Sequence, residues 1–114
     1  MDTTELTGAA LDWAVAKCEG IQGLVKRGNS LHYPPGQFSD EEAYTPSTDW
    51  AQGGPIIERE KMVLGYLSGL ACASTFEGNR HQRMEFGTTP LIAAMRCYVA
   101  SKLGDEVDVP EELK

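Results

Sequence analysis

Long apolar runs are scarce in this sequence of 114 residues. No stretch comes near the roughly 18 consecutive apolar residues that a helix needs to cross a bilayer, so the sequence excludes a transmembrane helix and a membrane partner. The first residues, MDTTELTG, contain neither a basic segment nor an apolar one. We therefore expect no secretory signal and a cytoplasmic protein.

Cysteine is also rare, with three residues that lie far apart at Cys18, Cys72 and Cys97. An odd number of widely spaced cysteines with apolar neighbours is typical of buried thiols in a reducing compartment, and not of a disulfide framework. Zinc sites need clustered ligands, whereas the two histidines, His32 and His81, stand alone. The sequence therefore predicts no metal site and no cofactor.

Basic residues are outnumbered, since 10 Lys and Arg face 17 Asp and Glu for a net charge of −7. Proteins that wrap nucleic acids carry the opposite excess, which excludes general nucleic-acid binding. Five of the acidic residues lie in the last ten positions beside one lysine, so residues 1–104 carry a charge of only −3. We interpret residues 1–104 as a single domain and residues 105–114 as a solvated acidic tail, with a docking element as the alternative.

Two stretches have the apolar spacing of helices. The first follows Thr7 as its N-cap and ends at Gly20. The second is capped by Thr89, begins with Pro90 and ends at Gly104. One face of this second helix is lined by small residues that would permit close approach by another helix or another subunit: Ala93, Cys97 and Ala100.

Residues 44–62 leave two interpretations open. In one, a helix capped by Ser47 or Thr48 passes through Gly53 and Gly54. In the other, a turn leads to a helix that begins with Pro55. We favour the second, because proline costs about 3 kcal/mol inside a helix and the two glycines would add up to about 2 kcal/mol.

Strand-forming residues dominate the chain between these helices. Residues 62–67, 70–76 and 83–86 predict antiparallel strands, with a turn at Gly78 and Asn79 joining the last pair, although residues 65–74 are also compatible with a helix. Residues 21–43 predict a long loop with one or two short strands, at 21–26 or 30–33. The predicted fold class is α+β: two main helices and a short middle helix packed on a small antiparallel β-sheet.

Three blocks of the sequence resemble a known family. ELTGAALDWAVAKCEG, YTPSTDWAQGGPIIERE and TPLIAAMRCYVASKLGDEVDVPEEL are similar to small tailed-bacteriophage proteins of the Nin-region X (NinX-like) type, a family of unknown function. The blocks cover 58 of the 114 residues, in the same order and with roughly the same spacing. The resemblance implies a phage or prophage accessory protein in the cytoplasm of the bacterial host, and it supplies no catalytic residues. Residues 21–43 and 65–86 depart from the family's usual pattern.

Two helix starts suggest a site for an anion, because the first N–H groups of a helix are unpaired and partly positive. One is STDWAQGGP, where aromatic side chains offer stacking surfaces, and the other is GTTP. Nearby arginines make a pocket for a phosphate-bearing small molecule plausible despite the negative charge. The candidate ligand-binding residues are Tyr44, Ser47, Thr48, Trp50, Gly53, Gly54, Arg59, Thr88 and Thr89.

The sequence favours binding over catalysis. Ser47, His32 and Asp49 form a triad only on paper, because no strained turn frames the serine, and Cys97 has the apolar neighbours of a core residue. Our first hypothesis is a non-catalytic homo-oligomer that binds and sequesters a nucleotide-type signal at a site between subunits, against host defence. The alternative is a protein-binding module that inhibits a host protein through its acidic tail or the loop of residues 21–43. An enzyme stays open as a third hypothesis.

Overall fold

The structure is a computed structural model, and it describes residues 1–33, 43–77 and 80–114. Its helices are α1 (Gly8–Glu19), α2 (Trp50–Arg59) and α3 (Pro90–Leu103), with two short 3-10 turns, η1 (Thr3–Glu5) and η2 (Glu111–Leu113). Its strands are β1 (Val25–Arg27), β2 (Ser30–His32), β3 (Ala43–Tyr44), β4 (Val63–Leu67), β5 (Leu70–Glu77) and β6 (Arg80–Gly87).

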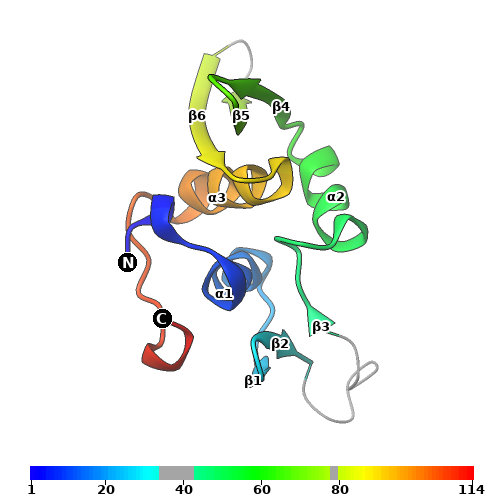
Figure 1. Ribbon diagram of the computed structural model, residues 1–114, viewed down its shortest axis with the longest axis vertical. Helices are drawn as coiled ribbons and strands as arrows, with labels where there is room; N and C mark the ends of the chain where they lie inside the picture. The colour runs from blue at the N-terminus through cyan, green and yellow to red at the C-terminus, as the bar shows by residue number, and fades with distance from the viewer. Residues whose placement is uncertain (34–42, 78–79) are drawn as a thin grey trace.

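The elements are stacked along the longest axis of the molecule, as Figure 1 shows. The sheet β4–β5–β6 lies at one end, α3 and then α1 follow, and the sheet β1–β2–β3 lies at the other end. All strand pairs in both sheets are antiparallel. The fold is therefore α+β, as predicted, but it has two three-stranded sheets in place of the one small sheet expected.

Helices α1 and α3 begin and end at the predicted cap residues, although the Thr7 side chain at the start of α1 makes no capping hydrogen bond. Gly20 ends α1 in the left-handed region at φ 75°. The Thr89 side chain accepts a hydrogen bond from the N–H of Ile92, Pro90 opens α3, and Gly104 follows its last residue. None of the helices in the described part of the chain is long and apolar enough to cross a membrane.

The face of α3 with the small residues packs inside the chain, against the β4–β5–β6 sheet. Ala93 and Cys97 are fully buried, and Ala100 is nearly so. A Cβ atom added to Gly87 at the end of β6 would lie 2.7 Å from the Ala93 backbone nitrogen. The close approach that these residues permit is therefore used inside the chain, and this face is closed to another subunit.

Our favoured interpretation of the middle helix is wrong. Helix α2 begins at Trp50, is capped by the Asp49 side chain and continues through Pro55. The reason is tertiary packing at Gly53, where an added Cβ would lie 2.4 Å from the Pro46 carbonyl oxygen and 2.6 Å from Leu91 Cδ1. Glycine lets α2 pack directly against the start of α3, and this contact outweighs the low helix propensity of the segment.

The three strands predicted between residues 62 and 86 are confirmed, and the helical alternative for residues 65–74 is wrong. The predicted turn at Gly78 and Asn79 lies outside the described residues. The segment 21–43 contains β1 and β2, as expected, and the sequence did not indicate β3. Residues 34–42 of that predicted loop also lie outside the residues that the structure describes.

The last ten residues pack against the beginning of the chain. Val107 and Val109 are buried, at 5% and 3% exposure. The Met1 amino group donates to the Val107 carbonyl oxygen at 2.7 Å, and the Val107 N–H donates to the Met1 carbonyl oxygen at 2.9 Å. The interpretation of residues 105–114 as a solvated tail is therefore wrong for these valines, although the acidic side chains between and beyond them stay exposed.

Candidate functional site

Two of the predicted binding residues, Tyr44 and Arg59, line the same cavity. Its volume is about 220 Å³, and it lies where the end of α1, strand β3 and helix α2 meet. Aromatic, apolar and charged side chains converge there, as in many small-ligand sites. The lining residues are Glu19, Ile21, Tyr33, Tyr44, Gln52, Pro55, Ile56 and Arg59.

Two tyrosine rings form one wall of this cavity. The Tyr33 and Tyr44 ring centroids lie 5.9 Å apart and the planes cross at 79°, an edge-to-face arrangement. Tyr44 is buried, and burial raises the pKa of its phenol well above the ordinary value of 10. Tyr44 therefore keeps its proton at neutral pH, and the two rings present aromatic surface to the cavity.

The position of Tyr44 is fixed by Gln52 on α2. The Gln52 side-chain amide donates to the Ala43 carbonyl oxygen at 2.9 Å and to the Asp49 carboxylate at 3.0 Å. Its carbonyl oxygen accepts from the Thr45 N–H at 3.0 Å. These bonds join β3 to the first turn of α2 and so hold Tyr44 in position relative to the helix.

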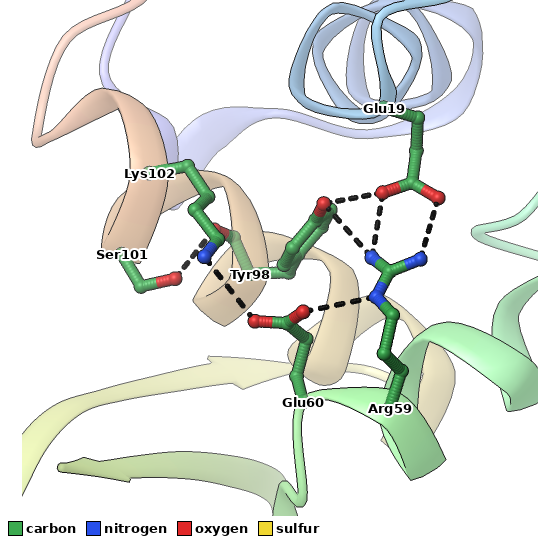
Figure 2. Close-up of polar contacts among 6 residues, drawn as sticks. All are labelled: Glu19, Arg59, Glu60, Tyr98, Ser101 and Lys102. Carbon is green, nitrogen blue, oxygen red and sulfur yellow. Dashed lines mark hydrogen bonds and ion pairs between the residues drawn. The ribbon is translucent and has the colours of Figure 1, made fainter.

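Arg59 stands at the rim of the cavity, and its side chain is half exposed. Figure 2 shows its guanidinium group between the carboxylates of Glu19, at the end of α1, and Glu60. The two Glu19 contacts measure 3.0 and 2.6 Å, a bidentate pair, and the Glu60 contact measures 3.0 Å. Glu60 also pairs with Lys102 at 3.3 Å. Two cations thus meet two carboxylates, and the cluster has no net charge.

Tyr98 on α3 completes the cluster, with its hydroxyl directed toward Glu19 and Arg59 (Figure 2). Its hydroxyl donates to Glu19 and accepts from Arg59 at 3.1 Å. Its ring lies 5.7 Å from the Arg59 guanidinium carbon and 6.0 Å from the Lys102 nitrogen, within the range of cation–π attraction. The cluster therefore ties together the last turns of α1 and α2 and the second half of α3.

Electrostatics in the cluster favours the ionised forms of its acid and its base. The hydrogen bonds from Arg59 are the main reason why the pKa of Glu19 lies below its usual value, and the Tyr98 hydroxyl acts in the same direction. The same bonds raise the pKa of Arg59. Burial is the main reason why the pKa of Tyr98 is raised, so its hydroxyl keeps its proton. A phosphate that approaches Arg59 must therefore compete with Glu19.

The rest of the predicted site is dispersed. Trp50 is 53% exposed and does not line the cavity, and Thr48 lies on the surface. Ser47 is buried, and its N–H donates to the carboxylate of Asp12 at 2.9 Å. Gly53 is buried against α3, as described above, and Gly54 is half-buried beside the Trp50 ring.

The two threonines before α3 lie away from the tyrosine wall. Thr88 lines a separate cavity of about 240 Å³ together with Glu85 and Arg96. Thr89 is occupied as the cap of α3. The structure therefore brings together Tyr44 and Arg59 from the predicted set and leaves the other members in different surroundings.

Three of the residues considered for catalysis, Cys97, Asp49 and Ser47, have structural roles. Cys97 is fully buried, and burial raises the pKa of its thiol to about 11. The Asp49 side chain caps α2, and Ser47 is bound through its N–H to Asp12. All three cysteines are free thiols. Cys72 and Cys97 are buried, as the sequence predicted, whereas Cys18 is only half-buried.

Several residues of the cavity and the cluster are missing from the predicted set, among them Glu19, Tyr33, Gln52 and Tyr98. A signal was present for Glu19, because a carboxylate in the last turn of a helix opposes the helix dipole and calls for a cation nearby. A local signal was also present for Gln52, which follows the cap Asp49 by three residues, the spacing of a capping box. No local signal marks Tyr33 and Tyr98, because their partners lie far from them along the chain.

A family model described as “Bacteriophage P22, NinX” matches residues 2–102, from the first turn η1 to the last turn of α3. No curated protein matches the chain significantly.

Proposed function

Because the chain belongs to the bacteriophage NinX family and is a phage accessory protein, we propose that it is a non-catalytic protein that binds and sequesters a nucleotide-type small molecule, against host defence. The proposal rests on one observation, the cavity that joins the tyrosine wall to the half-exposed Arg59. An aromatic wall accepts a planar ring, and a guanidinium group at the rim accepts an anionic substituent.

The size of the cavity decides how much of a ligand it takes. Whole small ligands occupy pockets of about 300–1,000 Å³, and this cavity of about 220 Å³ is smaller. It suits one ring of nucleobase size, while the sugar and phosphate extend over the rim toward Arg59. The described residues that line the cavity all lie between positions 19 and 59, so we place the ring of the ligand against this part of the chain.

Because the charges around Arg59 are already balanced, we expect the ring of the ligand to contribute most of the binding affinity. Arg59 already holds the Glu19 carboxylate in two hydrogen bonds, so an incoming phosphate gains only the difference between itself and that carboxylate. We therefore expect ligands with the same ring and different phosphate content to bind with similar affinity. Glu19→Gln weakens the internal pair, and this variant should favour the phosphate-bearing ligands.

Isothermal titration of the full chain tests the proposal, with cyclic dinucleotides, cyclic trinucleotides and cyclic ADP-ribose isomers as the probes. We expect heat with one of these classes and an affinity about tenfold or more lower in Tyr33→Ala, since stacking on an aromatic ring contributes about 1–3 kcal/mol per base. Trp50→Ala removes an exposed aromatic residue that does not line the cavity, so it should bind like the natural chain.

Folding of each variant is checked by circular dichroism. If the folded natural chain gives no heat with any probe, the nucleotide proposal is wrong. An equal loss in Tyr33→Ala and Trp50→Ala would place binding elsewhere.

The alternative proposal, a module that inhibits a host protein, is favoured by one observation in the loop of residues 21–43. Strand β1 lies at the edge of its sheet and is exposed along its whole length. Such an edge can accept a strand from a partner. The acidic tail is less suited to docking because its valines are buried in the chain itself. A host protein that is captured by the natural chain and lost in Val25→Pro would support this alternative.

A further inference from the structure

A second cavity lies at the end of α1, and it is larger than the cavity of the tyrosine wall. Its volume is about 340 Å³, against about 220 Å³ for the tyrosine cavity. It is lined by the last turns of α1 and by residues 20–24, and we call it the α1 cavity. Whole small ligands occupy pockets of about 300 Å³ and more. The α1 cavity is therefore large enough for a complete small ligand.

The apolar part of the α1 cavity is built around an indole ring. Trp13 is half-buried and packs against the hydrophobic core, as do Ile21 and Leu24, and all three line the cavity. Tryptophan offers a large flat apolar surface, and aromatic rings prefer to pack on one another in stacked or edge-to-face arrangements. This lining favours a ligand with a planar ring.

The charged part of the α1 cavity is a single cation, Lys17. Its ammonium nitrogen lies 5.1 Å from the centroid of the Trp13 ring, a cation–π contact that holds the charge at the cavity without neutralising it. Among the residues that the structure describes, no carboxylate pairs with Lys17, in contrast to Arg59, and none lines the cavity. In a chain with a charge of −7, this cavity is therefore a place where an anion is attracted.

The backbone of the turn between α1 and β1 also favours an anion (Figure 1). The Ile21 N–H donates to the Ala16 carbonyl oxygen at 2.9 Å, so this acceptor at the end of the helix is already occupied. In the described part of the chain, the N–H groups of Gln22 and Gly23 donate to no other residue. Successive N–H groups of a turn are common donors to anions. The turn that lines the cavity thus retains donors for a ligand.

We propose that the α1 cavity binds a planar aromatic anion, with its ring against Trp13 and its carboxylate or phosphate group on Lys17. The cation is not neutralised here, so this site selects a ligand by its charge as well as by its ring. Of the residues that line the two cavities, Ile21 alone belongs to both. Binding at the α1 cavity is therefore a separate property from the function proposed above.

Two-dimensional NMR of the full chain, labelled with nitrogen-15, tests this inference because it reports the two indole N–H groups separately. Trp13 lines the α1 cavity, whereas Trp50 is 53% exposed and lines neither cavity, so Trp50 is an internal control. We expect naphthoate or naphthyl phosphate to shift the Trp13 signal until it saturates and to leave the Trp50 signal unchanged. The tighter of the two probes identifies the anionic group.

Two further probes separate charge from ring. Naphthamide has the same ring and no charge, and cyclohexanecarboxylate has the charge and no planar ring. Each should bind about fivefold or more weakly than naphthoate, because one of the two contacts is lost.

Variants then identify the cation. Lys17→Gln, at an exposed position, should weaken the binding of naphthoate about fivefold or more, and Lys17→Arg should restore it. Lys61→Gln is the matched control, because Lys61 is also exposed and lines neither cavity. Tyr33→Ala alters the tyrosine cavity and should leave the affinity for naphthoate unchanged. A failed nucleotide titration therefore does not affect this inference, and the reverse also holds.

The inference is overturned if naphthoate shifts both indole signals alike or shifts neither. It is also overturned if folded Lys17→Gln binds naphthoate as tightly as the natural chain, or if naphthamide or cyclohexanecarboxylate binds as tightly as naphthoate. A loss of binding in Tyr33→Ala with an unmoved Trp13 signal would overturn it as well, because the anion would then occupy the tyrosine cavity.

Discussion

Replacing Asp12 by asparagine should stabilise the protein at neutral pH. Asp12 lies inside α1 with 3% of its surface exposed, and its carboxylate accepts a hydrogen bond from the Ser47 N–H. Burial raises the pKa of this carboxyl group from 3.8 to about 6, and the hydrogen bonds from Ser47 offset only part of the effect. Between these two pKa values, the Asp12 carboxyl group is protonated in the folded state and ionised in the unfolded chain.

The sign of the pH dependence follows from this proton. Between pH 3.8 and about 6 the folded state binds more protons at Asp12 than the unfolded state, so stability falls as pH rises through this window and is level above it. One pKa unit corresponds to about 1.36 kcal/mol, so the full loss is about 3 kcal/mol. Asp12→Asn keeps an acceptor for the Ser47 N–H and removes the ionisation, so its advantage should grow from near zero at acid pH to about 2–3 kcal/mol at pH 7.

Urea unfolding monitored by circular dichroism, at several pH values from 3 to 7, measures this difference. Subtracting the profile of the variant from that of the natural chain removes the contribution of the other carboxyl groups. Asp108→Asn, at an exposed position, controls for the loss of one negative charge. The reasoning is refuted if Asp12→Asn is less stable at pH 7, or if its advantage does not change with pH.

Two further predictions concern packing. Gly53→Ala should destabilise the protein by about 1–3 kcal/mol, because the new methyl group meets backbone at 2.4 Å, whereas Gly54→Ala, with its nearest atom at 3.9 Å, should stabilise it by up to about 1 kcal/mol. Urea unfolding of the pair decides this, and equal effects would contradict it. Val107→Ala should cost about 2 kcal/mol because the side chain is buried, and Asp108→Ala should cost almost nothing. Thermal unfolding compares these two, and a negligible effect of Val107→Ala would show that the last residues do not pack as described.

Local chemistry explains what the sequence predicted well. Thr89, Pro90 and Gly104 act within one or two turns of the helix that they begin or end, so their effect does not depend on the rest of the fold. The same holds for Gly20. The alternation and composition of residues 62–86 likewise contain enough local information to place three strands.

Tertiary contacts explain what the sequence predicted poorly. Nothing near Gly53 in the sequence shows that Leu91, 38 positions later, occupies the space where a side chain would be. Pro55 lowers the helix propensity of α2, but the close packing at Gly53 offsets this cost. Helix propensities do not include such tertiary contacts. The start of a helix is therefore predictable from its cap only when the helix does not depend on a close approach elsewhere.

The charges of the candidate site were also hard to predict, because the residues that pair there lie far apart in the sequence. Arg59 is visible in the sequence as a cation near aromatic residues, which suggests a free guanidinium group for phosphate. Its partner Glu19 lies 40 positions earlier, on another helix, and a third helix contributes Tyr98. Only the fold shows that the cation is neutralised, and this changes the ligand that the site favours from one selected by its phosphates to one selected by its ring.

This neutralisation also bears on the proposed binding of a nucleotide by an acidic protein. A bare carboxylate beside the cavity would repel phosphate, and a bare guanidinium group would bind many anions without regard to the attached ring. With Glu19 and Arg59 paired, neither effect dominates, and the tyrosine wall is left to discriminate among ligands. Selectivity then depends on the shape of a cavity whose lining lies between residues 19 and 59.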